Sequence, residues 1–96
     1  MIDHEVLKIL FDEYDEAVKK HPKFAVHGAH AVSLILEELG ELAKEGNDEI
    51  EHNDKECLPA IAWRQERAIR EAAHVAVTAI RTMEMLMENT EAMTGI

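Results

Sequence analysis

Apolar residues recur at three- and four-residue steps along three stretches of this chain, and this periodicity constrains the fold most strongly. In the first stretch the apolar set is Val6, Leu7, Leu10, Phe11, Tyr14 and Val18. Such spacing places side chains on one face of an α-helix, which we expect from about Asp3 to Lys20. The residue before a proline is disfavoured in the α region, so His21-Pro22 ends this helix.

A second helix is predicted over about His27 to Glu45. Its apolar positions again fall at helical steps, and they are Ala31, Leu34, Ile35, Leu39 and Leu42. Gly46-Asn47 is a typical helix stop. The polar segment from Asn47 to Leu58 is expected to form a mobile loop, in which Asp48-Glu49-Ile50 could add one short helical turn.

A third, long helix is predicted to start near Leu58-Pro59, because proline suits the first turn of a helix. Its apolar pattern continues through Ile61, Val75, Ile80 and Leu86. We expect the helix to fray after about Asn89, which leaves residues 90–96 as a tail.

The composition agrees with an all-α fold in one domain over residues 1–96. Of the 96 residues, 47% are hydrophobic but only 4% are aromatic, and glycine and proline are scarce. A chain of this length builds a limited core. We therefore expect a bundle of three main helices that is completed by oligomerisation, as a homodimer or a homotetramer.

The net charge and the first residues indicate which partners and which location to expect. The formal net charge of −10 argues against nucleic acid as a partner, since such binding depends on basic patches. The first residues lack the basic and apolar segments of a signal peptide, and no stretch is apolar enough to span a membrane, so a cytoplasmic location is expected. The single cysteine, Cys57, excludes an internal disulfide and a cysteine-rich zinc site.

Two short signatures lie on the second and third predicted helices: Glu37-Glu38-x-x-Glu41 and Glu71-x-x-His74. Positions three residues apart share a helix face, so each signature can direct two ligands at one ion. If the two helices pack antiparallel, four ligands converge. Carboxylates suit Mg²⁺ or Mn²⁺, whereas an imidazole shifts the preference towards Mn, Fe or Zn.

A glutamate-rich helical run is, by itself, usually a solvated surface. Here both signatures have apolar flanks, and carboxylates that converge in a poorly solvated place repel one another unless a cation binds between them. The pair of signatures therefore favours a divalent-metal site.

At these residues the chain resembles a known family. His21-Pro22-Lys23-Phe24, the run from Leu36 to Ala43 and the run from Arg70 to Arg81 resemble the MazG-like all-α nucleoside triphosphate pyrophosphohydrolases, and the resemblance covers most of the chain. It implies a helical core that forms dimers or tetramers and holds Mg²⁺ through carboxylates. It also implies cleavage of a nucleoside triphosphate to the monophosphate and pyrophosphate.

The resemblance also assigns roles to single residues. It implies that Glu38, Glu41 and Glu71 are metal ligands, and that Glu37 or Glu41 is the general base. The family's aspartate falls on His74, which is then a metal ligand or holds a water molecule. Because His74 replaces the family's aspartate, the chain could instead be a catalytically inactive relative that acts as a binding protein.

Several cations near the signatures are candidates for the phosphate oxygens of the substrate. They are Lys44, Arg67, Arg70 and the Lys19-Lys20 pair, with Arg81 as a further one. Trp63, the single indole, could stack on a base or lie in a helix interface. Phe24 and His27 are alternative base contacts.

A second functional class uses the same residues. Ferritin-like di-iron proteins combine a glutamate on one helix with Glu-x-x-His on another. Glu41 with Glu71 and His74 satisfies this pattern if a second copy supplies the other half, which would make the chain an iron-binding module.

Overall fold

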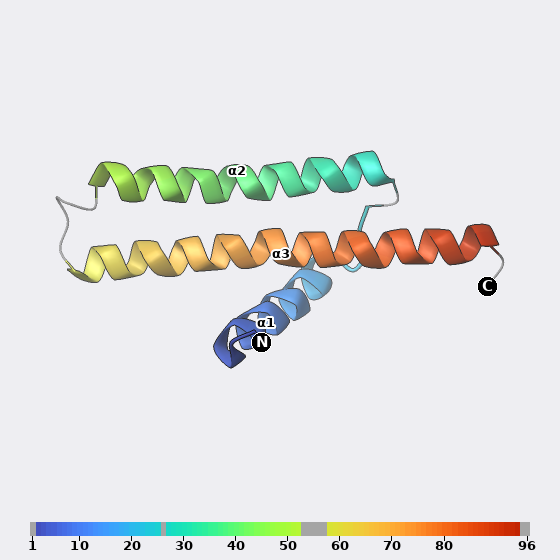
Figure 1. The fold of residues 1–96 in the computed structure, drawn as a ribbon, viewed down its shortest axis with the longest axis horizontal. Helices are drawn as coiled ribbons and strands as arrows, with labels where there is room; N and C mark the ends of the chain where they lie inside the picture. Colours follow the sequence, from blue (N-terminus) through green and yellow to red (C-terminus); the bar gives the residue numbers. More distant parts are fainter. Residues whose placement is uncertain (1, 26, 53–57, 95–96) are drawn as a thin grey trace.

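The protein is described here by a computed structural model that covers residues 2–25, 27–52 and 58–94, with side chains for 2–25, 27–46 and 63–93. Within these ranges it contains three helices and no strand: α1 His4–Lys20, α2 Gly28–His52 and α3 Leu58–Thr94 (Figure 1). The all-α prediction is confirmed. Among the helices described, none combines the length and apolar character that crossing a membrane requires.

Helix α1 has the predicted bounds, and its ends show why. The Asp3 side chain accepts a hydrogen bond from the Glu5 backbone N–H at 2.7 Å, which caps the first turn. Lys19 and Lys20 lie in the last turn, where positive charge is favourable with the helix dipole. The His21 N–H donates to the Ala17 carbonyl at 2.8 Å and closes the helix before Pro22.

The predicted end of α2 at Gly46-Asn47 is wrong, because the helix continues to His52. Gly46 keeps a helical backbone and does not take the left-handed conformation of a C-cap. A glycine inside a helix costs about 1 kcal/mol. The buried Glu45 next to it is tied to α3 through Arg67, and this contact helps to offset that cost.

Half of the segment that was expected to form a mobile loop is therefore helical. Residues 47–52 belong to α2, including the segment Asp48-Glu49-Ile50 that was predicted as one short turn. Residues 53–57, with Cys57, lie outside the described residues.

Helix α3 begins at Leu58 as predicted, but the expected fraying after Asn89 is wrong as far as Thr94. The sequence contains no glycine or proline between residues 60 and 94, so nothing in it breaks the helix there. The Thr90 hydroxyl also donates to the Leu86 carbonyl at 2.9 Å within this last part. Residues 95–96 of the predicted tail lie outside the described residues.

Helix α3 is the centre of the fold. Helix α2 runs antiparallel along it and α1 crosses it (Figure 1), and both helices pack against α3. The buried hydrophobic residues among those described are mostly small: Ala25, Ala31, Ala73, Val77 and Met85. Small residues at these positions let α2, α3 and the α1–α2 connection approach closely.

Arg81 joins α3 to the end of α1. Its guanidinium is buried and donates to the carbonyls of His21 at 2.7 Å and Ala17 at 3.4 Å. It also lies over the Phe24 ring, 4.9 Å from the ring centre. These contacts satisfy carbonyls at the C-terminal end of α1. The side chain that was considered as a phosphate contact is therefore engaged in holding α1 in place.

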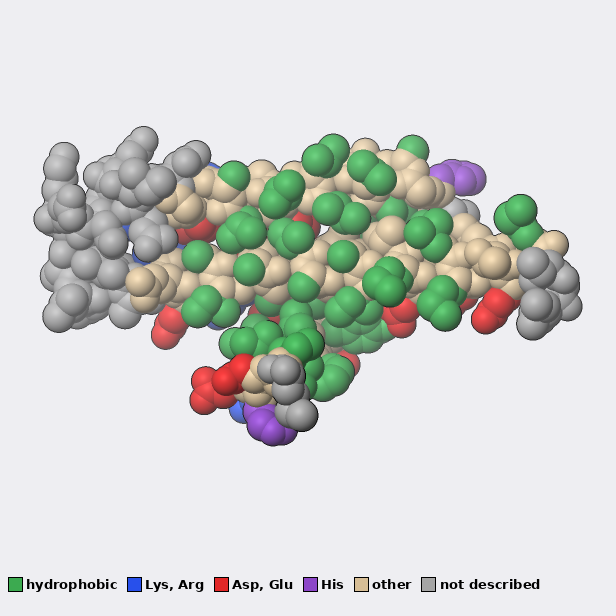
Figure 2. Space-filling view, viewed as in Figure 1, with side chains coloured by type: hydrophobic (Ala, Val, Ile, Leu, Met, Phe, Trp, Pro, Cys, Tyr) green, Lys and Arg blue, Asp and Glu red, His purple; other side chains and the backbone are tan. Residues whose placement is uncertain are grey.

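The molecule is elongated, with extents of 58 × 28 × 26 Å. Its radius of gyration is 16.3 Å, whereas a compact domain of this length has about 12.5 Å. Hydrophobic side chains lie along α2 and α3 on the face seen in Figure 2. The large exposed hydrophobic residues of these two helices include Val32, Leu36, Leu39, Ile69, Ile80, Met83, Leu86 and Met87.

Candidate metal centre

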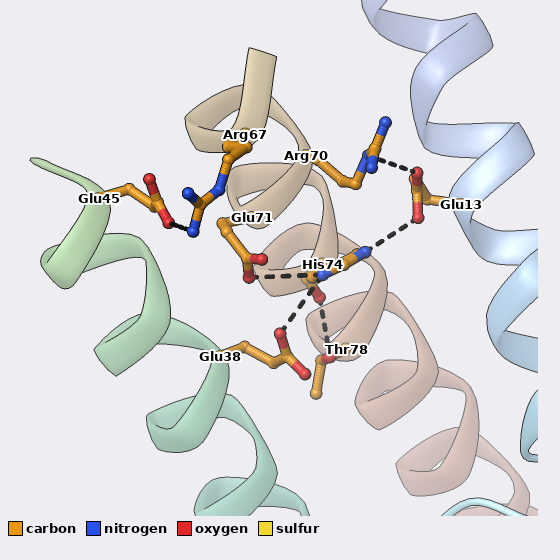
Figure 3. Close-up of polar contacts among 8 residues, drawn as sticks. All are labelled: Glu13, Glu38, Glu45, Arg67, Arg70, Glu71, His74 and Thr78. Carbon is orange, nitrogen blue, oxygen red and sulfur yellow. Dashed lines mark hydrogen bonds and ion pairs between the residues drawn. The ribbon is translucent and has the colours of Figure 1, made fainter. Parts of the chain in front are cut away.

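The two signatures meet where α2 and α3 lie side by side. Glu38 and Glu41 on α2, with Glu71 and His74 on α3, each offer one ligand atom, and these atoms all lie within 4.8 Å of one another. Figure 3 shows Glu38, Glu71 and His74 pointing towards a common point between the helices. The convergence that the spacing predicted is present. Metal binding by these residues stays a prediction.

His74 lies at the middle of the group. Its Nδ1 atom is 3.6 Å from Oε2 of Glu38 and 3.5 Å from Oε2 of Glu71 (Figure 3). Both distances exceed a normal hydrogen bond. The other ring nitrogen, Nε2, is only 2.9 Å from Oε2 of Glu13, which is hydrogen-bond distance. The ring is thus held from the α1 side and faces the two glutamates with Nδ1.

Sequence reasoning did not identify Glu13, which α1 places beside the centre. One oxygen of Glu13, Oε2, contacts His74, and the other, Oε1, lies 3.9 Å from Nε of Arg70. In the sequence Glu13 is one of several acids next to the apolar face of the first helix, with Asp12 and Glu16. No motif distinguishes it from them, because its role depends on how α1 crosses α3.

Two carboxyl groups of the centre have unusual proton affinity. Burial is the largest cause that raises the pKa of Glu38, and the charge of Glu41 follows it. A hydrogen bond with Glu71 is the largest cause that raises the pKa of Glu41, followed by burial and by the Glu71 charge. His74 lowers both pKa values but does not compensate for the crowding. The acids are therefore short of positive charge.

The side-chain donors at this centre suit a divalent cation. Oε2 of Glu38 and Oε2 of Glu71 are buried, and neither has a hydrogen-bond partner among the described residues. Buried oxygens of this kind are uncommon unless something else binds them. Two such oxygens facing an imidazole nitrogen, with Glu41 nearby, fit a divalent ion of the Mg²⁺ or Mn²⁺ type.

A cavity of about 500 Å³ adjoins this centre. Glu37, Glu38, Glu13 and His74 contribute to its wall. So do residues from the end of α1 and the α1–α2 connection, which include Lys20, His21, Lys23 and Phe24. Candidate metal ligands and cationic side chains therefore share one space.

Arg81 lines this cavity, whereas four other predicted substrate contacts lie elsewhere: Arg67, Arg70 and Trp63 on α3 and Lys44 on α2. Arg67 forms a 2.5 Å ion pair with Glu45 and lies over Trp63, 4.6 Å from the ring centre (Figure 3 shows the ion pair). Arg70 is near Glu13, as described above, and Lys44 is exposed on α2. None of these four residues lines the cavity. Their role in substrate binding stays a prediction.

Comparison with known proteins assigns the chain to no family, because no family model, no curated protein and no solved structure matches it.

Proposed function

We propose that the chain is a metal-dependent nucleoside triphosphate pyrophosphohydrolase, which converts a nucleoside or deoxynucleoside triphosphate to the monophosphate and pyrophosphate. The observation that carries the proposal is the convergence of Glu38, Glu41, Glu71 and His74 beside a cavity large enough for part of a nucleotide. The resemblance of both motifs to the MazG-like enzymes supports the choice of reaction.

Glu38, Glu41 and Glu71 would hold the metal through carboxylate oxygens, with His74 as the nitrogen ligand. A bound Mg²⁺ or Mn²⁺ ion would neutralise charge on the triphosphate and lower the pKa of a water molecule. Glu37 is exposed and lines the cavity next to Glu38, so its carboxylate is free to accept the proton of the attacking water. Glu41 is the second candidate base, because it lies in the same group of acids as Glu38 and Glu71.

The triphosphate needs positive charge in a chain whose net charge is −10. Lys20 and Lys23 both line the cavity and are exposed, so their ammonium groups can contact phosphate oxygens. Lys20 also lies 3.8 Å from Glu16, but both side chains are well exposed, and such a pair is weak. In this proposal the two lysines bind the end of the substrate that the metal does not hold.

The proposed enzyme is a homodimer or homotetramer. The small number of buried apolar residues among those described, and the exposed hydrophobic residues on α2 and α3, support this part of the proposal. Large exposed apolar surfaces on soluble domains often mark protein–protein contacts. A second copy of the chain would cover it, which sedimentation or light scattering measures directly.

The purified protein should release pyrophosphate from at least one member of a panel of canonical and modified triphosphates, with Mg²⁺ or Mn²⁺ present. Glu38→Gln and Glu71→Gln should each remove this activity while circular dichroism stays unchanged. Retained turnover in both variants would mean that the reaction does not use this centre.

The same assay separates the two alternative hypotheses. Absence of turnover on every triphosphate, together with oxygen consumption that depends on Fe²⁺, would support the ferritin-like di-iron module. Nucleotide binding without turnover or oxygen consumption would support the inactive MazG-like binding protein.

A further inference from the structure

The contact between Glu13 and His74 connects α1 to a centre that the sequence places on α2 and α3 alone. His74 Nε2 lies 2.9 Å from Glu13 Oε2, and the two side chains are 33% and 22% exposed. Glu13 is itself held from a second side, since its Oε1 lies 3.9 Å from Arg70 Nε. The carboxylate therefore has a defined position against the imidazole.

This contact determines which nitrogen of His74 can bind a metal. An ionised carboxylate only accepts hydrogen bonds, so the nitrogen next to Glu13 must carry a hydrogen. In a neutral imidazole the lone pair is then on Nδ1. Nδ1 is the atom that faces Oε2 of Glu38 and Oε2 of Glu71, at 3.6 and 3.5 Å.

A carboxylate behind a metal-binding histidine is a recurrent arrangement, because it fixes the ring orientation and makes the free nitrogen a better ligand. An imidazole ligand favours transition ions, whereas Mg²⁺ prefers oxygen ligands only. We infer that Glu13 is a positioning residue that presents His74 Nδ1 to the metal, and that the centre selects Mn²⁺ and similar transition ions over Mg²⁺. This inference rests on the metal centre of the proposed function, but not on the hydrolytic reaction.

The inference is tested by metal binding to the full chain without nucleotide. The electron paramagnetic resonance signal of free Mn²⁺ gives the Mn²⁺ affinity, and competition gives the Mg²⁺ affinity. Glu13→Ala should weaken Mn²⁺ binding about 10–100-fold, as loss of a partner behind a metal ligand does elsewhere. Its effect on Mg²⁺ should stay within about threefold, because Mg²⁺ gains little from the imidazole.

Two matched variants separate positioning from charge and from folding. Glu16→Ala removes the same charge from the same helix, at another side chain that lines the cavity, and should leave Mn²⁺ affinity within about twofold. Glu13→Gln keeps an oxygen that accepts from Nε2 and should retain most of the affinity. If Glu13→Ala fails to fold, Glu13→Gln still tests the proposal, since it must keep the preference for Mn²⁺.

A double-mutant cycle with His74→Asp tests whether Glu13 changes the Mn²⁺ affinity through His74. His74→Asp replaces the nitrogen ligand by oxygen and should shift the preference towards Mg²⁺. In that background Glu13→Ala should no longer change Mn²⁺ affinity. The inference is overturned if Glu13→Ala behaves like Glu16→Ala, if it weakens both metals equally, or if its effect persists beside His74→Asp.

The two proposals fail differently. Metal binding with the expected selectivity but without nucleotide hydrolysis contradicts the proposed function and leaves the role of Glu13 intact. Binding of Mg²⁺ without binding of Mn²⁺ contradicts the role of Glu13 and leaves the proposed function intact. Absence of binding of either ion by the unmodified protein contradicts both proposals.

Discussion

Two places along the α2–α3 interface bury carboxylates, and they compensate the negative charge in different ways. Near the end of α2, Glu45 is almost fully buried and pairs with Arg67 at 2.5 Å, while Trp63 covers the guanidinium. Seven residues earlier on α2, Glu38 faces Glu71 with only the imidazole of His74 between them. Three carboxylates share this second place, since Glu41 is also close.

The comparison separates a structural ion pair from a site that is suited to a ligand. Glu45 has one oxygen without a hydrogen-bond partner among the described residues, as Glu38 and Glu71 do. The difference lies in the charge, because a permanent cation balances Glu45 and none of that kind contacts Glu38 or Glu71 in the ion pairs described. Unbalanced carboxylates at the centre are the physical reason to expect an added cation there.

The largest expected effect is on metal affinity. Glu38→Gln and Glu71→Gln should each lower Mn²⁺ affinity by more than the roughly 10–100-fold expected for a partner behind a ligand. Glu45→Gln, a matched change in the same interface, should leave the affinity within about twofold. Electron paramagnetic resonance of free Mn²⁺ measures all three, and an equal loss in Glu45→Gln would remove the distinction between the two places.

The next effect is on folding stability, and it arises at the Glu45–Arg67 ion pair and not at the metal centre. Arg67→Ala leaves the Glu45 carboxylate buried without its cation and should lower the free energy of unfolding by about 2 kcal/mol. We expect no more, since the Arg67 side chain is 43% exposed and solvent screens part of the interaction. Urea unfolding provides the measurement.

A companion variant checks the cause of that loss. Arg67→Met combined with Glu45→Met removes both charges and keeps the apolar stems, so it should recover most of the stability. If the double variant is as unstable as Arg67→Ala, packing of the long side chain explains the loss and the ion pair does not.

The third effect is the pH dependence of the metal-free protein. The folded-state pKa values of Glu38 and Glu41 are raised above 4.5, so the folded protein binds protons that the unfolded chain releases in this window. The contribution of these two groups to stability is therefore present at acid pH and is lost as pH rises through the folded-state values. Near neutral pH, Glu38→Gln should raise the melting temperature of the metal-free protein.

Thermal unfolding with EDTA between pH 4.5 and 7.5 measures this contribution as the difference between the unmodified protein and Glu38→Gln. Added Mn²⁺ should abolish or reverse the difference, because the ion stabilises the ionised carboxylates of the unmodified protein. Equal melting temperatures at every pH, with and without Mn²⁺, would contradict the picture of a centre short of positive charge.

Much of the fold and of the centre could be predicted from the sequence, because both depend on local spacing. The three-residue steps placed Glu38 with Glu41 and Glu71 with His74, and antiparallel packing of α2 and α3 then brought the pairs together. The end of α2 was missed because Gly46 keeps a helical backbone and the helix continues through it to His52. Glycine permits a helix to end but does not require it.

The contacts that join distant elements could not be predicted in this way. Glu13 reaches His74 only because α1 crosses α3 at one particular place, and no periodicity in the sequence encodes that crossing. The pairing of Arg67 with Glu45 likewise required the two helices in register. From the sequence alone, Arg67 is one of several cations that could bind phosphate.

The smallest expected effect concerns Trp63, which the sequence left between base stacking and a structural role. Its ring is 58% exposed and lies under Arg67, outside the cavity. A cation–π contact at an exposed site contributes about 0.5–1 kcal/mol, so Trp63→Leu should lower the free energy of unfolding by that amount. The KM for a nucleoside triphosphate should stay unchanged in this variant, whereas Lys23→Ala in the cavity should raise it. A raised KM in Trp63→Leu with unchanged KM in Lys23→Ala would move the substrate to the Glu45–Arg67 end of the interface, and the ion pair there would then belong to the functional site.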